Sequence, residues 1–390
     1  MKRLTISDIA TMAGVSNGTV SYALNDRPGV SAQTRERILR IADELGWRPS
    51  AAARALKVAR AQTVGLAITR DAATLGIEPF FMRFIAGMEG ELAAHRTGLL
   101  LQVAGDHHEA LETMRDWWAE KRVDGVIVTD LWNHDLRLPE LERMGVPTVL
   151  VGAPRPGCPF PAVWSDDAAA VTTAVDHLVE LGHRDIARVA GLTALQHTHV
   201  RTGAFRAAAV RHGLRSAPVL ATDYSWEQGA LATHHLLTGR LRPTAIVFDN
   251  DVMALAGLSA ARQLGVAVPG ELSIVAGDDS QLCEMVYPAL TAVSRNVQAY
   301  GAAVARVLLD SVGDGTGDSR QEPTARLRVR GSTAPADRGR RDRDTLDRDT
   351  LDRQTLRVPA VSARDRAVPW TPAAPAPVPP QERRRSRPTG

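Results

Sequence analysis

The sequence predicts an N-terminal all-α helix-turn-helix head, a two-lobed α/β body and a disordered C-terminal tail. Apolar residues recur at helical spacing over the first 48 residues, and apolar runs then alternate with amphipathic stretches over residues 63–336. Such alternation is typical of parallel sheets in α/β layers, and roughly 275 residues is long for a single sheet, so two lobes are expected. Residues 337–390 combine charge, proline and a repeated Asp-Arg-Asp-Thr-Leu unit, which cannot build a core.

The head is expected to contain three short helices. Gly14 ends the apolar face of the first helix, and a turn cluster at residues 25–29 follows the second. Ser31 is expected to cap the third helix and Gly46 to stop it. The inward-facing residues are expected to be Ile6, Ile9, Ala10, Ala13, Val20, Ala23, Leu24, Thr34, Ile38, Ile41 and Leu45.

Residues 49–62 form a separate segment between head and body. The segment is rich in alanine, which favours helix, and Leu56 is its largest apolar side chain. Little anchors such a helix to a core, and a helix this short is marginal in water. We therefore expect the segment to fold only against a partner.

Seven apolar runs in the body are expected to be strands. They span residues 63–69, 98–103, 125–129, 147–151, 187–190, 245–248 and 272–276. Amphipathic helices are expected between them, for example over residues 81–95, 168–181 and 251–264. Because ligands of parallel α/β sheets bind at the carboxyl ends of the strands, we expect the binding site there.

The composition excludes several classes of protein. The chain is 44% hydrophobic and 23% charged, and it lacks the apolar run of about 18 residues that would cross a membrane. Asp8 interrupts the apolar stretch that a signal peptide requires, so a cytoplasmic location is expected. The two cysteines, Cys158 and Cys283, predict neither a disulfide framework nor a metal site.

The net charge of +3 is unevenly distributed. Residues 1–60 carry 10 basic and 5 acidic side chains, residues 337–390 carry 13 and 8, and the residues between them are acidic overall. A basic end on an acidic body indicates a polyanionic partner, although an ordinary solvated face would give the same count.

No pattern in the chain predicts catalysis. A phosphate-cradling Walker motif, a nucleophile elbow and a His-Glu-x-x-His sequence are all absent from the sequence. The paired carboxylates and paired histidines lack partners at catalytic or metal-ligand spacing. We expect a protein that is not an enzyme and that uses no cofactor and no metal ion.

Residues 8–21 are typical of a helix-turn-helix. Ala10 is small enough for two helices to cross closely, Gly14 permits a left-handed turn, and Ser16 can cap the second helix. Such units place the second helix in the major groove of DNA, and its free N-terminal N–H groups suit a phosphate.

With these residues the chain resembles the lac repressor (LacI) family over residues 1–336. The likeness is carried by Thr5-Ile6-Ser7-Asp8-Ile9-Ala10, Val15-Ser16, Thr19-Val20-Ser21, Leu24-Asn25, Arg54-Ala55-Leu56, Asn250-Asp251, Asp278-Asp279-Ser280 and Arg330-Gly331-Ser332-Thr333-Ala334. The resemblance implies a homodimeric transcriptional repressor that binds a palindromic operator in double-stranded DNA and is controlled by a small, sugar-like effector.

The resemblance also implies the domain plan. Residues 1–48 would be the DNA-binding head, residues 49–62 a hinge helix, and residues 63–336 a periplasmic-binding-protein-like body for effector binding and dimerisation. The expected N-lobe spans about 63–162 plus 292–320, and the expected C-lobe spans about 163–291 plus 321–336.

DNA contacts are assigned from the same resemblance. Asn17, Gly18 and Tyr22 are expected to face the bases, and Tyr22 departs from the Arg that the family commonly carries. Leu56, beside Arg54, is expected to wedge into the minor groove, with a plain linker as the alternative. Ser21 is also consistent with a helix-face residue that contacts nothing. The expected phosphate contacts are Thr5, Ser16, Thr19, Ser21 and Asn25.

Five residues are expected to bind the effector. Phe80 is expected in the loop after the first strand, and Asn250 and Asp278 follow two later strands. Arg201 and Tyr224 are assigned from the resemblance. Arg, Asn and Asp suit hydroxyl-rich or anionic ligands, whereas aromatic rings stack on sugars. For each residue the alternative is a strand-end cap or a structural salt bridge.

Two further points bear on the function. Gly152 stands where many relatives carry Asp, so one polar contact to the ligand is expected to be missing. The alternative function is a sugar-binding carrier protein with an unrelated helical N-terminus. Such a carrier would need export and would not bind DNA, whereas DNA binding by a regulator weakens steeply with salt.

Overall fold

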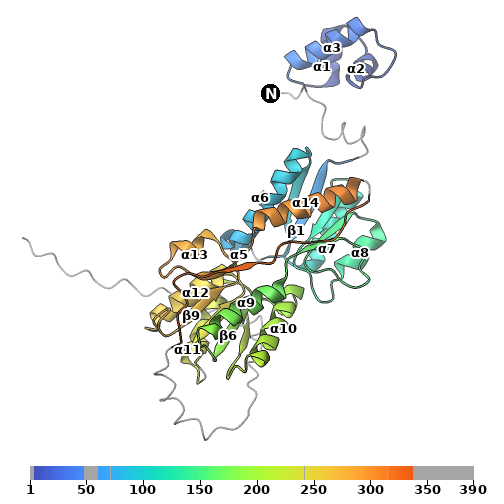
Figure 1. The fold of residues 1–390 in the computed structure, drawn as a ribbon. Coiled ribbons are helices and arrows are strands. Elements are labelled where there is room, and N and C mark those ends of the chain that lie inside the picture. Colours follow the sequence, from blue (N-terminus) through green and yellow to red (C-terminus); the bar gives the residue numbers. More distant parts are fainter. Residues whose placement is uncertain (1–3, 48–59, 71, 241, 314, 337–390) are drawn as a thin grey trace, which may run out of the picture. The chain divides into compact units, whose positions relative to one another are not determined.

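The fold comes from a computed structural model that describes residues 4–47, 60–70, 72–240, 242–313 and 315–336 (Figure 1). Within this part, the chain forms a helical head and a body with two sheets. The predicted hinge residues Arg54 and Leu56 lie outside the described residues, as does the predicted tail over residues 337–390.

The head consists of α1 (Ile6–Ala13), α2 (Asn17–Leu24) and α3 (Ala32–Glu44). Gly14 has a φ of 62°, the left-handed conformation that ends α1 and turns the chain into α2. Ser31 caps α3, because its hydroxyl oxygen accepts a hydrogen bond from the Thr34 N–H at 3.3 Å. The predicted helix-turn-helix and the predicted cap are confirmed. The head core contains Ile9, Ala10, Ala13, Val20, Ala23, Ile38 and Ala42.

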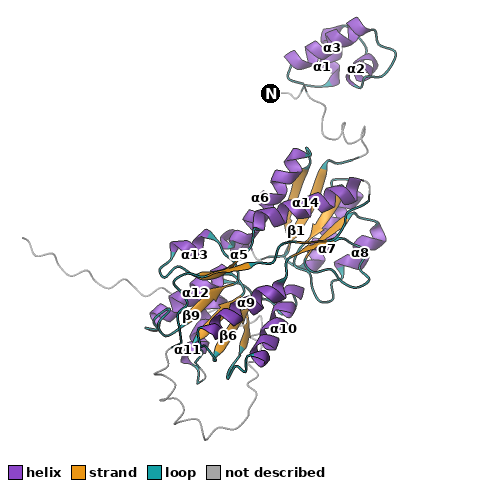
Figure 2. Ribbon diagram, viewed as in Figure 1, coloured by secondary structure: helices purple, strands orange, loops and turns teal. Residues whose placement is uncertain are grey.

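The first sheet of the body has six parallel strands in the order β11-β5-β4-β3-β1-β2. In Figure 2 its strands are drawn in orange around the label β1. Its strands are β1 (Thr63–Ile68), β2 (Gly98–Val103), β3 (Gly125–Val128), β4 (Thr148–Val151), β5 (Ala162–Trp164) and β11 (Arg320–Gln321). Its helices are α5 (Ala72–Ile77), α6 (Pro79–Ala94), α7 (His107–Ala119), α8 (Arg137–Met144) and α14 (Val297–Gly313).

Two layers of helices bury this sheet. Phe84 of α6 and Val304 of α14 pack on Leu66 of β1, whereas Met114 and Trp117 of α7 pack in a second cluster with Val126 of β3. Both faces are therefore covered, which explains why the strands are continuously apolar rather than alternating.

The second sheet has the order β12-β10-β9-β8-β6-β7, and only β12 is antiparallel to its neighbour. Its strands are β6 (Ile186–Ala190), β7 (Val219–Ala221), β8 (Ala245–Phe248), β9 (Ser273–Ala276), β10 (Thr291–Ser294) and β12 (Arg326–Arg328). Its helices are α9 (Asp167–Glu180), α10 (Gln196–Arg211), α11 (Trp226–Thr238), α12 (Asp251–Gln263) and α13 (Gln281–Met285). Helices α11 and α12 share one apolar cluster with this sheet, and α9 and α10 share another.

The lobe boundaries differ from those expected. β5 pairs with β4 in the first sheet, so the N-lobe extends to residue 164 rather than 162. β10 pairs with β9 in the second sheet, so the return to the N-lobe comes after residue 294 rather than at 292. The last crossing comes after Gln321, because β11 pairs with β5. Backbone pairing decides which lobe a strand joins, and a strand's composition does not reveal its partner.

The seven predicted strands are confirmed, each with its ends within one residue of those expected. The sequence missed β5, β7, β10, β11 and β12. Four of these strands have two or three residues, which is too few for a pattern to emerge, and β10 has polar residues, Thr291 and Ser294, at both ends.

Candidate functional site

The first candidate surface is the exposed side of α2 in the head. The Ser16 hydroxyl oxygen accepts a hydrogen bond from the Thr19 N–H at 3.1 Å and so caps the helix. Asn17 and Gly18 are exposed in the first turn, and Tyr22 follows one turn later with 45% of its surface exposed. Val20 and Ala23 face the core, so the predicted DNA contacts share the solvent side of α2.

Hydrogen bonds orient several of these side chains. The Asn17 amide nitrogen donates to the Ser7 hydroxyl at 3.0 Å, which joins α2 to α1. The Asn25 amide donates to the Ser21 carbonyl oxygen at 2.8 Å. At the start of α1, the Thr5 hydroxyl donates to an Asp8 carboxylate oxygen at 2.7 Å. The predicted head contacts therefore lie on one ordered helical unit, apart from Arg54 and Leu56, which are outside the described residues.

The second candidate site is the cleft between the two sheets of the body. It contains an inner chamber of about 90 Å³ and an outer chamber of about 280 Å³, which share Val151, Gly152, Asp167 and His197 in their walls. The inner chamber is lined by ionisable and aromatic side chains from both lobes. They are Arg70, Glu78, Phe80, Phe81, Asp130, Asp167, His197, Arg201, Tyr224, Asp249, Asp278, Arg295 and Tyr300.

Arg201 of α10 forms a buried ion pair with Asp167 of α9. Its Nε and Nη2 atoms donate to one Asp167 oxygen at 2.9 and 2.7 Å, and its Nη1 donates to the Asp249 carbonyl oxygen at 3.4 Å. Burial alone would raise the pKa of Asp167, but Arg201 and Arg295 outweigh it and lower that pKa to about 2. This pair is ionised and lies against the chamber wall.

Tyr224 connects the two lobes at the chamber. Its hydroxyl hydrogen-bonds His197 Nε2 at 2.7 Å and the Thr198 hydroxyl at 3.0 Å, both on α10. The guanidinium of Arg70, which follows β1, lies 4.6 Å from the centre of the Tyr224 ring. A Cβ at Gly191 would overlap this ring, so glycine is required there. Burial raises the pKa of Tyr224, which therefore stays protonated and can donate a hydrogen bond.

Phe80 lies in the first turn of α6 rather than in the expected loop, because α6 begins at Pro79 directly after Glu78. Proline is favoured at the first position of a helix, where its missing N–H costs nothing. The Phe80 ring stacks on Phe84 at 5.8 Å and meets Phe81 edge-on at 5.4 Å. It lines the inner chamber, as expected of an aromatic wall.

Asn250 is used differently from the other four predicted residues. Its side-chain oxygen accepts from the Met253 N–H at 2.8 Å and caps α12, and its amide donates to the Tyr224 carbonyl oxygen at 3.4 Å. It is 1% exposed and does not line either chamber. Of the two alternatives stated above for this residue, the structure shows the strand-end cap.

Acidic groups of the inner chamber have unused hydrogen-bonding capacity. Burial raises the pKa of Glu78 to about 7, and Asp278 and Asp130 add to the shift while Arg70 opposes it. Asp130 accepts from Arg70 Nη2 at 3.0 Å, and Asp278 lies 3.7 Å from Arg295 Nη2. One oxygen each of Glu78 and Asp130 is buried without a hydrogen-bond partner. Such atoms are suited to a ligand that donates hydrogen bonds.

Sequence reasoning missed Arg70, Glu78, Asp130, Asp167 and Arg295. Arg70 and Asp130 each follow a strand by two residues, and Arg295 follows β10 directly. The strand-end rule that identified Asn250 and Asp278 would have found Arg70 and Asp130, because their strands were predicted. Asp167 and Arg295 follow β5 and β10, which were not, and Glu78 lies in a helix–helix connection, where no pattern signals it.

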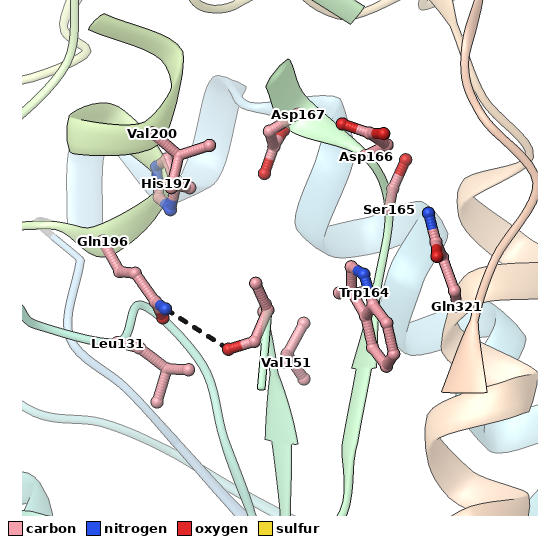
Figure 3. A pocket seen from close by; sticks show the side chains of 12 residues that line it. Leu131, Val151, Trp164, Ser165, Asp166, Asp167, Gln196, His197, Val200 and Gln321 are labelled. Atoms are coloured by element: carbon pink, nitrogen blue, oxygen red, sulfur yellow. Dashed lines mark hydrogen bonds between the residues drawn. The ribbon is translucent and has the colours of Figure 1, made fainter. Parts of the chain in front are cut away.

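The outer chamber adjoins the inner one at the four lining residues that the two share, and Figure 3 shows it from close by. Leu131, Val151 and Trp164 lie along one side, and Ser165, Asp166 and Asp167 lie along the other. The Gln196 amide donates to the Ala153 carbonyl oxygen at 3.3 Å, which joins the lobes at the rim.

Two searches of the described residues bear on the class of protein. They contain no group of three or more His, Cys, Asp or Glu side chains placed to hold a metal ion. None of the helices in the described ranges has the length and apolar character needed to span a membrane.

Two family models match the chain. The model described as "Bacterial regulatory proteins, lacI family" covers residues 5–50, and the model described as "Periplasmic binding protein-like domain" covers residues 175–333. The first match contains the helix-turn-helix, and the second contains most of the second sheet with its part of the cleft.

Curated relatives match over nearly their whole length. The HTH-type transcriptional regulator CelR of Thermobifida fusca is 32% identical over 80% of this chain and 92% of its own. The HTH-type transcriptional repressor CytR of Escherichia coli strain K12 is 32% identical over 84% of this chain and 96% of its own. The expectation that the chain is not an enzyme is confirmed by these relatives, which are transcriptional regulators.

Solved structures agree with this likeness. A LacI family transcriptional regulator from Bifidobacterium animalis subsp. lactis is 35% identical with a TM-score of 0.66, and the match covers 71% of this chain and all of that one. The Lac repressor dimer bound to operator has a TM-score of 0.75 at 24% identity over 85% of this chain and all of that one, which is a likeness of fold. The chain therefore belongs to the lacI family of bacterial regulatory proteins, with a DNA-binding helix-turn-helix head and a periplasmic-binding-protein-like body.

Proposed function

We propose that this chain is a transcriptional repressor that binds a palindromic operator as a homodimer and is controlled by a neutral, hydroxyl-rich effector in the cleft between its lobes. The observation that carries the proposal is that one chamber is lined by guanidinium groups and by acceptors without a hydrogen-bond partner from both lobes, in a chain whose head matches the lacI family. Such a protein acts in the cytoplasm, where the chromosome is.

In the head, base contacts are assigned to Asn17, Gly18 and Tyr22. If the Asn17 amide releases its hydrogen bond to Ser7, it is free to pair with adenine. Gly18 has no side chain, so the backbone there can approach the groove closely. Tyr22 offers a hydroxyl and a ring where a guanidinium would favour guanine. Phosphate contacts are assigned to Thr5, Ser16, Thr19, Ser21 and Asn25, which orient the head without selecting a sequence.

Between head and body, residues 49–62 are proposed to form a hinge helix on DNA. In this proposal Leu56 enters the minor groove at a central base step and Arg54 contacts the adjacent backbone. Both residues lie outside the described part of the chain, so the proposal rests on the sequence alone. A wedge of this kind favours a flexible pyrimidine–purine step at the operator's centre.

The dimer is proposed to form along β2 of the N-lobe. β2 is the edge of the first sheet, and Leu101 and Val103 are 42% and 41% exposed on it. An edge strand with exposed apolar side chains is a template for association. In the proposed dimer, a second copy of the chain covers the exposed apolar side chains of this edge. Two heads then face the two halves of a palindrome.

The ligand class follows from the charges of the inner chamber. Glu78, Asp130, Asp167, Asp249 and Asp278 outnumber Arg70, Arg201 and Arg295 in its lining. An anion would meet this excess of carboxylates, whereas hydroxyl groups can donate to the oxygens of Glu78 and Asp130 that have no hydrogen-bond partner. The solved complex of the regulator CelR with cellobiose, 30% identical to this chain, supports a sugar.

Four of the five predicted effector residues are assigned direct roles. Arg201 and Asp278 bind hydroxyl groups, and Phe80 and Tyr224 provide aromatic walls. Asn250 is assigned a positioning role, because it holds the Tyr224 backbone and the start of α12.

Control of DNA binding requires that the ligand distinguish two lobe arrangements. Several contacts cross between the lobes here: Gln196 N–H donates to the Leu131 carbonyl at 2.7 Å, and Arg83 Nη1 donates to the Asp279 carbonyl at 2.8 Å. In this proposal, a ligand that bridges the lobes stabilises the arrangement for which it has the higher affinity, and the change in lobe angle repositions the hinge helices.

The test is recovery of genomic DNA fragments by the full-length chain, followed by titration of a recovered fragment in the presence of neutral sugars. The proposal predicts specific fragments whose affinity changes with one class of sugar. Tyr22→Ala should lose the preference for those fragments while Tyr287→Ala, an exposed tyrosine in the C-lobe, keeps it. Sugar binding with no preferred fragment would instead support a carrier protein.

A further inference from the structure

We propose that residues 131–133 of the N-lobe and residues 194–196 of the C-lobe form a latch, a pair of backbone hydrogen bonds that holds the two lobes together. By favouring one arrangement of the lobes, the latch sets the affinity of the chain for DNA before any effector binds. The effect on DNA rests on the proposed function. The effect on the lobes does not, because it follows from contacts within the body alone.

The latch joins the loop after β3 to the loop after β6. The Gln196 N–H donates to the Leu131 carbonyl oxygen at 2.7 Å, and the Asn133 N–H donates to the Ala194 carbonyl oxygen at 3.1 Å. One bond therefore runs in each direction between the lobes. All four groups belong to the backbone, so the pairing does not depend on which ligand the cleft binds.

Each half of the latch is anchored in the core of its own lobe. Trp132 and Leu195, the central residue of one segment and its partner in the other, form an antiparallel β-bridge. Leu131 is 2% exposed and belongs to an apolar cluster of the N-lobe, whereas Leu195 is 1% exposed and belongs to a cluster of the C-lobe. A separation of the lobes at this point therefore has to break the latch.

The N-lobe segment is held in shape by an ion pair within that lobe. The side chains of Arg137 and Asp135 are 1% and 0% exposed, and Arg137 Nη2 donates to Asp135 Oδ2 at 2.7 Å. Arg137 Nη2 also donates to the Thr129 carbonyl oxygen at 2.9 Å, and Asp135 Oδ2 accepts from the Trp132 N–H at 3.1 Å. Because these bonds already order the segment, its pairing with the C-lobe costs little conformational entropy.

The C-lobe segment has a donor that its own helix does not use. Gln196 is the first residue of α10, and the N–H of a first helical residue has no partner within the helix. The preceding residue, Leu195, is extended, with a φ of −78° and a ψ of 135°. The Gln196 N–H is therefore available to the other lobe. The position also tolerates proline, which lacks an N–H and favours an extended residue before it.

The experiment compares Gln196→Pro with Gln196→Ala in the full-length chain by amide hydrogen exchange. Both variants lose the side-chain bond to Ala153, but only proline removes the N–H that donates to Leu131. The measured site is the Asn133 amide on the opposite lobe, which the latch protects while the lobes are paired. One backbone hydrogen bond changes an equilibrium about fivefold, so the Asn133 amide should exchange at least about fivefold faster in Gln196→Pro than in Gln196→Ala.

The same two variants test the effect on DNA. Their melting temperatures should be comparable, because proline suits the first turn of a helix. Their affinities for a DNA fragment recovered as described above should differ by at most the factor seen in exchange, because the latch and DNA act on one equilibrium between lobe arrangements.

The wild type provides a measurement that does not depend on how well either variant folds. If its Asn133 amide exchanges at the rate of an unstructured chain, or if the amide exchanges equally fast in both variants, the latch is overturned. Faster exchange in Gln196→Pro with equal DNA affinities overturns its role in control. A chain with no preferred DNA fragment contradicts the proposed function, and with it this role, whereas the exchange result still supports or overturns the latch.

Discussion

At the residue scale, the cleft is lined by charged side chains that pair with one another, and some of their hydrogen-bonding atoms have no partner. Arg201 neutralises Asp167, Arg188 pairs with Asp249 at 2.7 Å, and Arg70 reaches Asp130 at 3.0 Å. Glu78 has a raised pKa, and its Oε2 atom, 3.9 Å from Arg70 Nε, has no hydrogen-bond partner. Pairing holds the walls in place, and the remaining acceptors are available for ligand hydroxyl groups.

Arg201→Ala should both destabilise the chain and abolish the response of DNA binding to the effector. Removing one partner of a fully buried ion pair costs about 3–5 kcal/mol, and the cost here should be smaller because the side chains of Arg201 and Asp167 remain 12% and 19% exposed. Calorimetry and DNA titration separate the two effects when Asp167→Asn is added. The double variant should regain thermal stability and remain unresponsive. A normal effector response in the double variant would show that Arg201 has a structural role only.

Glu78→Gln should change how thermal stability depends on pH. The folded pKa of Glu78, about 7, is above its ordinary value of 4.5, so its contribution to stability is present below pH 4.5 and is lost as the pH rises through 7. Arg70, Asp130, Asp278 and Asn250 face this carboxyl and remain in the variant.

The melting temperatures of the wild type and of Glu78→Gln should be compared at about pH 5, 6, 7 and 8, a range that spans the expected titration of Glu78. The variant should gain on the wild type as the pH rises, because glutamine mimics the protonated acid. Parallel curves would mean that Glu78 titrates normally in the folded chain.

At the scale of single elements, the two serine caps of the head separate stability from DNA contact. Ser16 caps α2 and Ser31 caps α3, each by accepting a hydrogen bond from the backbone N–H three residues later. Each Ser→Ala change should lower the free energy of unfolding by about 1 kcal/mol. Only Ser16 belongs to the predicted DNA-contacting surface. Ser16→Ala should therefore weaken operator binding clearly more than Ser31→Ala at matched thermal stability, as measured by anisotropy. Equal losses of affinity would remove Ser16 from the interface.

The edge of the first sheet carries a prediction about assembly. Leu101→Arg places a charge on β2 and should shift the chain from dimer to monomer in sedimentation analysis, because an unpaired charge is costly in an apolar interface. Val210→Arg is the control, since Val210 is 83% exposed on α10 of the other lobe. If Leu101→Arg sediments as wild type does, the dimer contact lies elsewhere.

Strands that are continuous apolar runs were predictable from the sequence, whereas the strands with which they pair were not. The runs that became β1 and β8 were found because parallel strands buried on both faces are continuously apolar. β5 and β11 are too short to show a period, and their pairing placed the lobe crossings two residues and one residue later than expected. Asp167 and Arg295 follow such unpredicted strands, which is why this part of the site was missed.

At the scale of the whole molecule, one chain contains both a DNA-binding head and a periplasmic-binding-protein-like body. The family match shows the two parts, and the chemistry of the cleft supports the proposed ligand. Coupling requires that ligand binding and DNA binding influence each other reciprocally, by the same factor in affinity.

Operator binding by the dimer is tested by selecting bound duplexes from a random DNA pool with the full-length chain at two salt concentrations. A dimeric repressor with a Leu56 wedge should enrich, at both salt concentrations, a palindrome of roughly 14–20 base pairs with a flexible pyrimidine–purine step at its centre. Binding without enrichment, which simply weakens as salt rises, would contradict it, because only nonspecific attraction of a basic segment to DNA would remain.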